Sequence, residues 1–167
     1  MNFNQLTKTQ KLTISGMIMA LYIVIVYVTQ GLSFGAFQIR IATSLYAMSY
    51  VCPFLIVPLG LANFIANMLF GGLGILDMVG GCLVGMATTG FIVLIRRKKL
   101  NHWFVLLPII AIPGFGVSSW LSYLLNVPYL MLVFSLCVGQ AIPAICGVFL
   151  IKLFERYNKR FAIKRSM

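Results

Sequence analysis

Long apolar runs, separated by short clusters of glycine, proline and polar residues, make up most of the chain. A membrane-spanning helix needs about 20 apolar residues to cross roughly 30 Å of hydrocarbon. Breaks in the apolar pattern fall at residues 30–40, 53–60 and 71–74. The pattern therefore predicts an all-α membrane protein, a six-transmembrane-helix bundle that forms a single membrane domain over residues 1–167. Its helices are predicted near residues 12–29, 42–57, 59–70, 75–95, 103–125 and 129–153.

The third predicted helix, 59–70, is shorter than the others. A helix of this length spans only about 18 Å at 1.5 Å per residue, which is less than the hydrocarbon thickness. We expect this segment to tilt, to lie where the bilayer is locally thin, or to follow a partly re-entrant path.

The composition excludes a water-soluble domain. The chain is 61% hydrophobic and only 9% charged, whereas an ordinary soluble domain is about 25% charged. Thirteen Lys and Arg residues against two acids give a formal net charge of +11. A nucleic-acid-binding protein would spread such charge over a wettable surface. Here the basic residues are clustered between apolar runs, so we expect no nucleic-acid partner and a lipid bilayer as the surroundings.

The basic clusters also predict the topology. Twelve of the thirteen basic residues lie at Lys8 and Lys11, in the block Arg96–Lys99, and between Lys152 and Arg165. An excess of Lys and Arg on short flanking segments marks the cytoplasmic side of a membrane protein. We therefore expect a multi-pass protein of the cytoplasmic membrane with both termini in the cytoplasm. This topology requires an even number of spans before the central block and an even number after it.

Catalytic and metal-binding chemistry is poorly represented in the chain. It has one histidine and two acids, and it lacks the motifs H-E-x-x-H, G-x-S-x-G and G-x-x-x-x-G-K-[ST]. Proteases, hydrolases and ATPases of known type need such groups. The four cysteines are isolated in apolar runs, which favours packing over a metal site or a disulfide. We therefore predict no enzyme activity, no metal and no cofactor.

A charged pair marks the predicted outer end of the bundle. Gln38 and Arg40 fall in the first external loop, and Asp77 begins the fourth helix from the same side. Because a charge at the bilayer centre costs about 2.5–3.5 kcal/mol, these groups should face a cavity, a partner or the interface. Trp120 and Tyr123 precede an external turn and add aromatic faces. A structural ion pair and an aromatic belt at the lipid headgroups are the alternative interpretations.

Three amides extend this set of polar residues into the membrane. Asn63 and Asn67 are four residues apart and share one face of a helix, and Gln140 lies near the middle of the last span. Buried amides must be hydrogen-bonded, either to neighbouring helices or to a ligand. Together with the charged pair they suggest an outward-opening cup for a small, flat, polar ligand. Separately, Gly16 and Ala20 form a small-residue face on the first helix, which suits close helix docking.

Three stretches resemble the QueT family of substrate-binding S components of energy-coupling factor (ECF) transporters. They are LSFGAFQIRIATSL at 32–45, NFIAN at 63–67 and GLGILDMVGG at 72–81. The resemblance implies a six-helix vitamin-transporter architecture with both termini inside, which binds its ligand from outside under the first external loop. It further implies a transmembrane coupling subunit, docked on the face of Gly16 and Ala20, and two cytoplasmic ATPase subunits. The substrate implied is a queuosine precursor, a deazaguanine base.

The sequence departs from that family at two acids. Thr43 stands where the family usually has Glu after the arginine, and Gln140 replaces an acid in the last helix. A guanine-like edge would still find an acceptor in Asp77, a donor in Arg40 and a stacking surface in Trp120. Losing two carboxylates weakens the match to a cationic or donor-rich ligand, since each buried unpaired donor costs about 1–3 kcal/mol.

Other functions remain open from the sequence. The chain is also compatible with an S component for a different vitamin or micronutrient. From another class, a membrane-embedded enzyme acting on lipid would have Asp77 and Arg40 as its sole candidate pair. A ligand-free assembly factor would use the same polar residues to join its helices.

Overall fold

The computed structural model describes residues 6–35, 37–71 and 73–164, with side chains to residue 157. Within these ranges all the regular secondary structure is helical, and five helical segments are long and apolar enough to cross a membrane. This confirms the prediction of an all-α, multi-pass membrane protein. The five segments are Lys8–Val28, Pro53–Gly71, Ile75–Arg97, His102–Leu125 and Tyr129–Tyr157.

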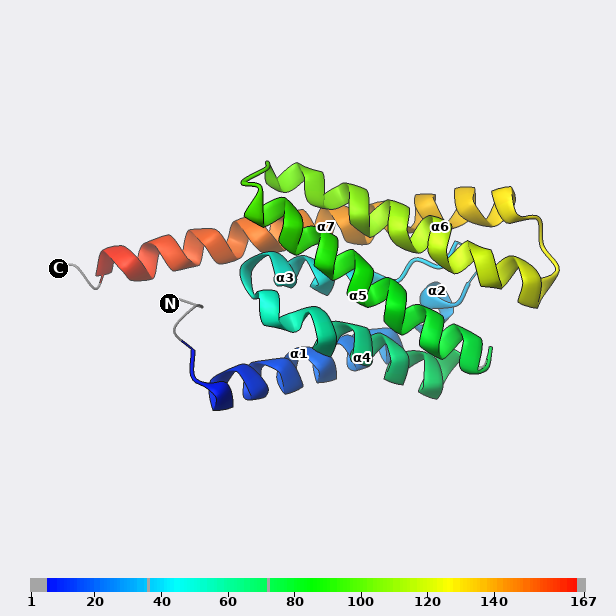
Figure 1. Cartoon of the computed structure of the whole chain (residues 1–167), viewed down its shortest axis with the longest axis horizontal. Coiled ribbons are helices and arrows are strands. Elements are labelled where there is room, and N and C mark those ends of the chain that lie inside the picture. The colour runs from blue at the N-terminus through cyan, green and yellow to red at the C-terminus, as the bar shows by residue number, and fades with distance from the viewer. Residues whose placement is uncertain (1–5, 36, 72, 165–167) are drawn as a thin grey trace.

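Four of these segments match predicted helices closely. They contain α1 (Lys8–Val28), α5 (Ile75–Arg97), α6 (Leu106–Leu125) and α7 (Tyr129–Lys164). Helix α7 continues well beyond the predicted residue 153, and its last turns extend past the bundle (Figure 1). Thr7 caps α1 by accepting a hydrogen bond from the Gln10 amide, while the Gln10 side chain accepts from the Thr7 amide.

The predicted helix at 42–57 is wrong as a continuous α-helix. A 3₁₀ helix, Ile41–Ala47, leads into the four-residue α3 (Met48–Val51), and Cys52 breaks the run. Pro53 lacks an amide hydrogen and forces the residue before it out of the helical region, as the extended ψ of Cys52 shows. The hydroxyl of Thr43 also bonds the carbonyl three residues back, which competes with regular α-helical bonding.

The chain nevertheless crosses the bundle along this irregular segment. Its first end lies beside the outer part of α4, because Arg40 bonds Asn67. Its last end lies beside the end of α5, because Arg96 donates to the carbonyl of Val51 at 3.0 Å. The side chains from Ala42 to Ser49 are buried. Irregular backbone is tolerated at membrane depth when protein encloses it, so this pass is built into the core.

The expectation of a short third span is also overturned. Pro53–Gly71 is one 19-residue segment, in which the 3₁₀ turn Pro53–Leu55 runs into α4 (Ile56–Ala66) and the π-helix Asn67–Gly71. Pro58 falls in the first turn of α4, where the helix needs no amide hydrogen from it. This proline therefore does not divide the segment, and no re-entrant path is needed to explain its length.

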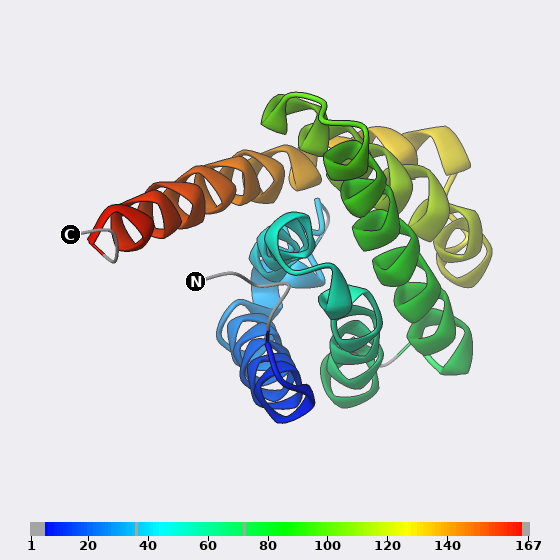
Figure 2. The same ribbon diagram turned by 60° about the vertical axis from the view of Figure 1, so that its left-hand side comes forward.

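The helices run back and forth along one direction, and α1 begins at the end of the bundle where α7 finishes (Figure 1). Helices α4 and α5 pack side by side, as do α6 and α7, and α1 lies at one edge against α4 (Figure 2). The main core surrounds the irregular segment and contains Tyr22, Tyr46, Leu55, Ile92 and Ile109, each almost fully buried. The polar residues lie at one end of the bundle, and the loop with the basic block Arg96–Lys99 lies at the other end.

The short helix α2 (Gln30–Ser33) follows α1 and begins the first loop. Its turn is held by the hydroxyl of Thr29, which bonds the carbonyl of Ile25 at 2.7 Å. The loop then passes through Phe37 and Gln38 before the chain enters the core at Ile41. Residues 30–35 and 37–40 therefore lie at the polar end of the bundle.

Candidate binding site

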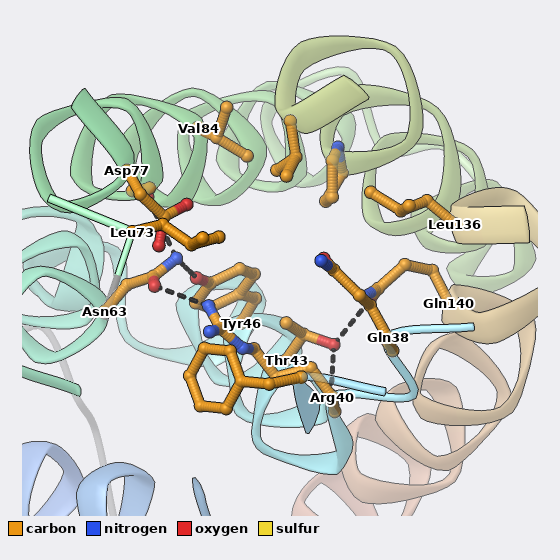
Figure 3. Close-up of a pocket in the computed structure, with 14 residues that line it drawn as sticks. Gln38, Arg40, Thr43, Tyr46, Asn63, Leu73, Asp77, Val84, Leu136 and Gln140 are labelled. Atoms are coloured by element: carbon orange, nitrogen blue, oxygen red, sulfur yellow. Dashed lines mark hydrogen bonds between the residues drawn. The ribbon is translucent and has the colours of Figure 1, made fainter. Parts of the chain in front are cut away.

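One pocket opens beneath the first loop, and residues from this loop, the 3₁₀ helix Ile41–Ala47 and helices α4, α5, α6 and α7 line it, with Leu73 just before α5 (Figure 3). It has about 500 Å³ of empty space, part of which is open to solvent. Most polar lining residues come from the first loop, Ile41–Ala47 and α4, and helices α5, α6 and α7 supply the apolar ones together with Asp77 and Gln140. The lining residues are Phe34, Gln38, Arg40, Thr43, Tyr46, Asn63, Leu73, Asp77, Gly81, Val84, Pro113, Val117, Leu136 and Gln140.

Two side-chain amides, Asn63 of α4 and Asn67 at the start of the following π-helix, hold the guanidinium group of Arg40. Its two terminal nitrogens donate to Asn63 Oδ1 at 2.7 Å and to Asn67 Oδ1 at 2.6 Å. The i, i+4 spacing places both amides on one face of the helical segment, so they bind the flat guanidinium together. The Phe34 ring lies beneath, with its centroid 4.9 Å from Arg40 Cζ. The side chain of Arg40 is thus fixed from two sides.

The side-chain nitrogens of Asn63 and Asn67 form further hydrogen bonds that connect these residues to neighbouring elements. Asn63 Nδ2 donates to the Tyr46 hydroxyl at 2.8 Å and to the Gly81 carbonyl at 2.9 Å. Asn67 Nδ2 donates to the backbone carbonyl of Asp77 at 3.0 Å. A Cβ at Gly81 would lie 2.5 Å from Asn67 Nδ2, so the close approach of α5 to these amides requires glycine.

Asp77 lies in the same pocket as Arg40, but the two side chains form no ion pair. Among the described residues the single salt bridge joins His102 Nε2 to Glu155 Oε2 at 2.9 Å. Asp77 is 6% exposed, and its Oδ1 accepts a hydrogen bond from Trp120 Nε1 at 3.2 Å. The interpretation of this pair as a direct structural ion pair is therefore wrong. Asn67 lies between the two charged residues instead.

Thr43 and Gln140 join the irregular segment to α7. The Thr43 hydroxyl lies 2.7 Å from Gln140 Oε1, and Gln140 Nε2 donates to the carbonyl of Gln38 at 3.3 Å. Both side chains are buried, at 2% and 4% exposure. Gln38 has φ of +43°, and the Phe37 carbonyl lies directly against Gly139, where a Cβ would collide with it. The first loop is therefore fixed on α7 at these two positions.

The two predicted aromatic residues of α6 have different positions. Trp120 does not line the pocket, but its indole holds Asp77 and packs over Gly80. Tyr123 is 80% exposed and lies outside the pocket, so its assignment to the site is corrected. Leu121, which is buried, precedes it by two residues. Two residues correspond to about 200° around a helix, so Tyr123 faces away from the bundle.

Sequence reasoning missed several lining residues. Tyr46 lies three residues after Thr43, and a 3₁₀ helix with three residues per turn places both on one face. That signal was hidden because the segment reads as an ordinary apolar helix. Phe34, whose ring lies against the guanidinium of Arg40, was missed as well. The apolar wall carries no sequence signal of its own and consists of Leu73, Val84, Pro113, Val117 and Leu136.

The small-residue face of α1 is exposed. Gly16 and Ala20 are both exposed on the side of α1 that faces away from the bundle. Nothing from the rest of the bundle comes within 4 Å of a Cβ placed at Gly16. Helix α1 is also the least buried of the five long segments. This face is therefore free for lipid or for another protein.

A set of membrane-length apolar helices around an irregular buried segment defines a multi-pass helical membrane protein. Within that class, the QueT transporter family matches residues 12–156, and the chain belongs to this family. The match covers nearly all of the five long segments and every pocket residue. No match was found among curated proteins or among solved structures. Family membership identifies the chain as a transporter protein rather than an enzyme.

Proposed function

We propose that the chain is the substrate-binding S component of an ECF-type importer. It binds a queuosine-precursor-like deazaguanine, or a closely related flat heterocycle, from outside the cell. A transmembrane coupling subunit and two cytoplasmic ATPase subunits supply the energy for uptake. Family membership supports transport, and the buried polar pocket supports binding of a small polar molecule.

The fixed guanidinium of Arg40 is the observation that carries this proposal. Arg has five N–H donors, and two nitrogens bond Asn63 and Asn67 through one hydrogen each. Among the described residues no acceptor is bonded to the remaining donors, so they can donate to a carbonyl oxygen of the ligand. Asp77 lines the same pocket, and among the described residues only Trp120 donates to its carboxylate. The second carboxylate oxygen is therefore an acceptor for ligand N–H groups, as the edge of a guanine-like base requires.

The apolar wall suits the face of such a ring. Val84 of α5 lies across the pocket from Thr43 and Arg40, and Leu136 of α7 lies beside Gln140 (Figure 3). A planar heterocycle has a polar edge and apolar faces, so it matches a cavity with one polar and one apolar side. A bare ion would leave the apolar wall unused, and a lipid tail would leave the charged groups unpaired.

The proposed orientation in the membrane follows from the basic residues. Arg96 and Arg97 end α5, while Asp77 begins it, so the basic block and the pocket lie at opposite ends of the same helix. Basic flanking segments are retained in the cytoplasm. We therefore place both termini in the cytoplasm and the pocket at the outer side of the cytoplasmic membrane, where it receives ligand from outside.

Ligand affinity of pocket variants tests this function. Asp77→Asn keeps the shape of the side chain but removes the charge, and Arg40→Lys keeps the charge but loses the two-nitrogen contact with the amides. Each variant is expected to bind a deazaguanine about ten- to a hundredfold more weakly, since a hydrogen bond to a charged group contributes about 1.5–3 kcal/mol. Isothermal titration on purified protein measures the affinity, and Tyr123→Phe, outside the pocket, is the matched control.

Thermal stability separates binding from folding in the same experiment. A ligand that binds only the folded protein raises its stability by RT ln(1 + [L]/Kd). The variants should therefore unfold as cooperatively as the unmodified protein without ligand, yet gain less stability when ligand is added. Unchanged affinity in both variants would exclude the proposed site. If no heterocycle or B vitamin stabilises the unmodified protein, a ligand-free assembly role becomes the better interpretation.

A further inference from the structure

We propose that the pocket selects an uncharged ligand over a cationic one, and that Thr43 and Gln140 set this selectivity. The inference rests on the proposed function, because it concerns which heterocycle the same pocket accepts. Its basis is the distribution of charge and of hydrogen-bond donors around the cavity.

Asp77 is the one acid available to this pocket. The chain has two acidic residues in all. The other, Glu155, lies fifteen residues beyond Gln140 on α7, or about 22 Å along the helix axis. Its carboxylate contacts His102 at 2.9 Å. The charged groups of the pocket are therefore Arg40 and Asp77, whose formal charges cancel.

A cationic ligand would have to share Asp77 with Arg40. No carboxylate of the described residues lies within 4.0 Å of the guanidinium, so Asp77 is its nearest source of compensating charge. That carboxylate is almost fully buried and already accepts from Trp120. A second positive charge in this low-dielectric space would be repelled by Arg40 and left without a counterion. A neutral ligand creates no such deficit.

The Thr43–Gln140 side of the pocket offers a hydrogen-bond donor. The Thr43 hydroxyl lies 2.7 Å from both the Arg40 carbonyl oxygen and Gln140 Oε1, and these two acceptors share its one hydrogen. This occupies the amide oxygen of Gln140, while its nitrogen uses one hydrogen for the Gln38 carbonyl. The second amide hydrogen has no acceptor among the described residues. A ligand substituent on this side is therefore best satisfied as an uncharged acceptor, such as a nitrile, and poorly satisfied as an ammonium group.

Two deazaguanines that differ only in this substituent provide the test. At neutral pH, 7-cyano-7-deazaguanine is uncharged and 7-aminomethyl-7-deazaguanine carries a protonated amine. Isothermal titration on the purified, full-length chain should show at least about tenfold tighter binding of the cyano compound. Gln140→Glu adds a carboxylate of nearly the same shape and should reduce this preference by at least about tenfold or reverse it.

Gln140→Met is the matched control for the hydrogen bond to Gln38. Both variants lose the amide donor and should bind the cyano compound more weakly, but only Gln140→Glu adds charge, so only that variant should bind the aminomethyl compound more tightly. The same shift in both variants would overturn the assignment to charge. Equal or tighter binding of the aminomethyl compound by the unmodified chain would overturn the inference while leaving the proposed function intact. If neither compound binds, the inference and the deazaguanine assignment both fail.

Discussion

At the scale of single residues, the pocket is held by hydrogen bonds with a defined direction. Arg40 can only donate, so Asn63 presents its oxygen to the guanidinium and its nitrogen to the hydroxyl of Tyr46. The Tyr46 hydrogen is then available for the hydroxyl of Tyr22 on α1, 3.2 Å away. A series of hydrogen bonds therefore runs from the pocket to the core face of α1. In such a series each hydrogen bond strengthens the next.

This order predicts different effects for two Tyr→Phe changes. Tyr46→Phe removes an acceptor that helps fix Asn63, so we expect a few-fold weaker ligand binding and about 1 kcal/mol lower stability. Tyr22→Phe removes the last hydroxyl in this series of hydrogen bonds and leaves Asn63 bonded to Tyr46. It should therefore lower stability with little effect on ligand affinity. Titration and thermal unfolding of both variants measure the two effects. Equal losses of ligand affinity in both variants would show that a hydroxyl's position in this hydrogen-bond series does not matter for binding.

At the scale of elements, the sequence predicted which residues are polar and buried more reliably than it predicted helix continuity. The predicted helices at 75–95 and 103–125 are mainly apolar, and the structure confirms them. The run at 42–57 has the same composition, but Pro53 and the Thr43 hydroxyl break its α-helical bonding. Apolar content indicates burial, whereas backbone hydrogen bonding decides the kind of helix, so composition alone missed the 3₁₀ segment.

The contact between the first loop and α7 predicts the sign of a glycine substitution. In a helix interior, Gly→Ala normally stabilises by about 0.5–1 kcal/mol, and Gly90, with open space around it, should follow this rule. Gly139 should not, because an added Cβ would collide with the Phe37 carbonyl and displace the loop from Gln140. We expect Gly139→Ala to destabilise the protein and weaken ligand binding several-fold. Stabilisation of both variants in thermal unfolding would contradict the loop contact.

At the scale of the whole molecule, charge predicted only that the number of passes on each side of the central basic block is even, and nothing about their form. The basic clusters required an even number of passes on each side of Arg96–Lys99, and α1 begins where α7 finishes, as this requires. The structure has five long segments and the irregular segment Ile41–Val51, which is buried among them. Charge clusters report the side on which a segment ends. They carry no information on whether the path between two ends is a regular helix.

The exposed position of α1 predicts that binding and uptake can be separated. Under the proposed function, the coupling subunit docks on the face of Gly16 and Ala20, where small residues allow close approach of helices. Gly16→Leu should therefore reduce uptake in cells at least about tenfold, because a large side chain holds the partner helix away. Ligand affinity of the purified chain should be unchanged, since no pocket residue lies on α1.

Gly90→Leu is the matched control, because Gly90 also has open space around it but lies on α5. If Gly16→Leu and Gly90→Leu support the same uptake, the docking face lies elsewhere on the bundle, whereas loss of ligand binding in Gly16→Leu would show that α1 shapes the pocket itself.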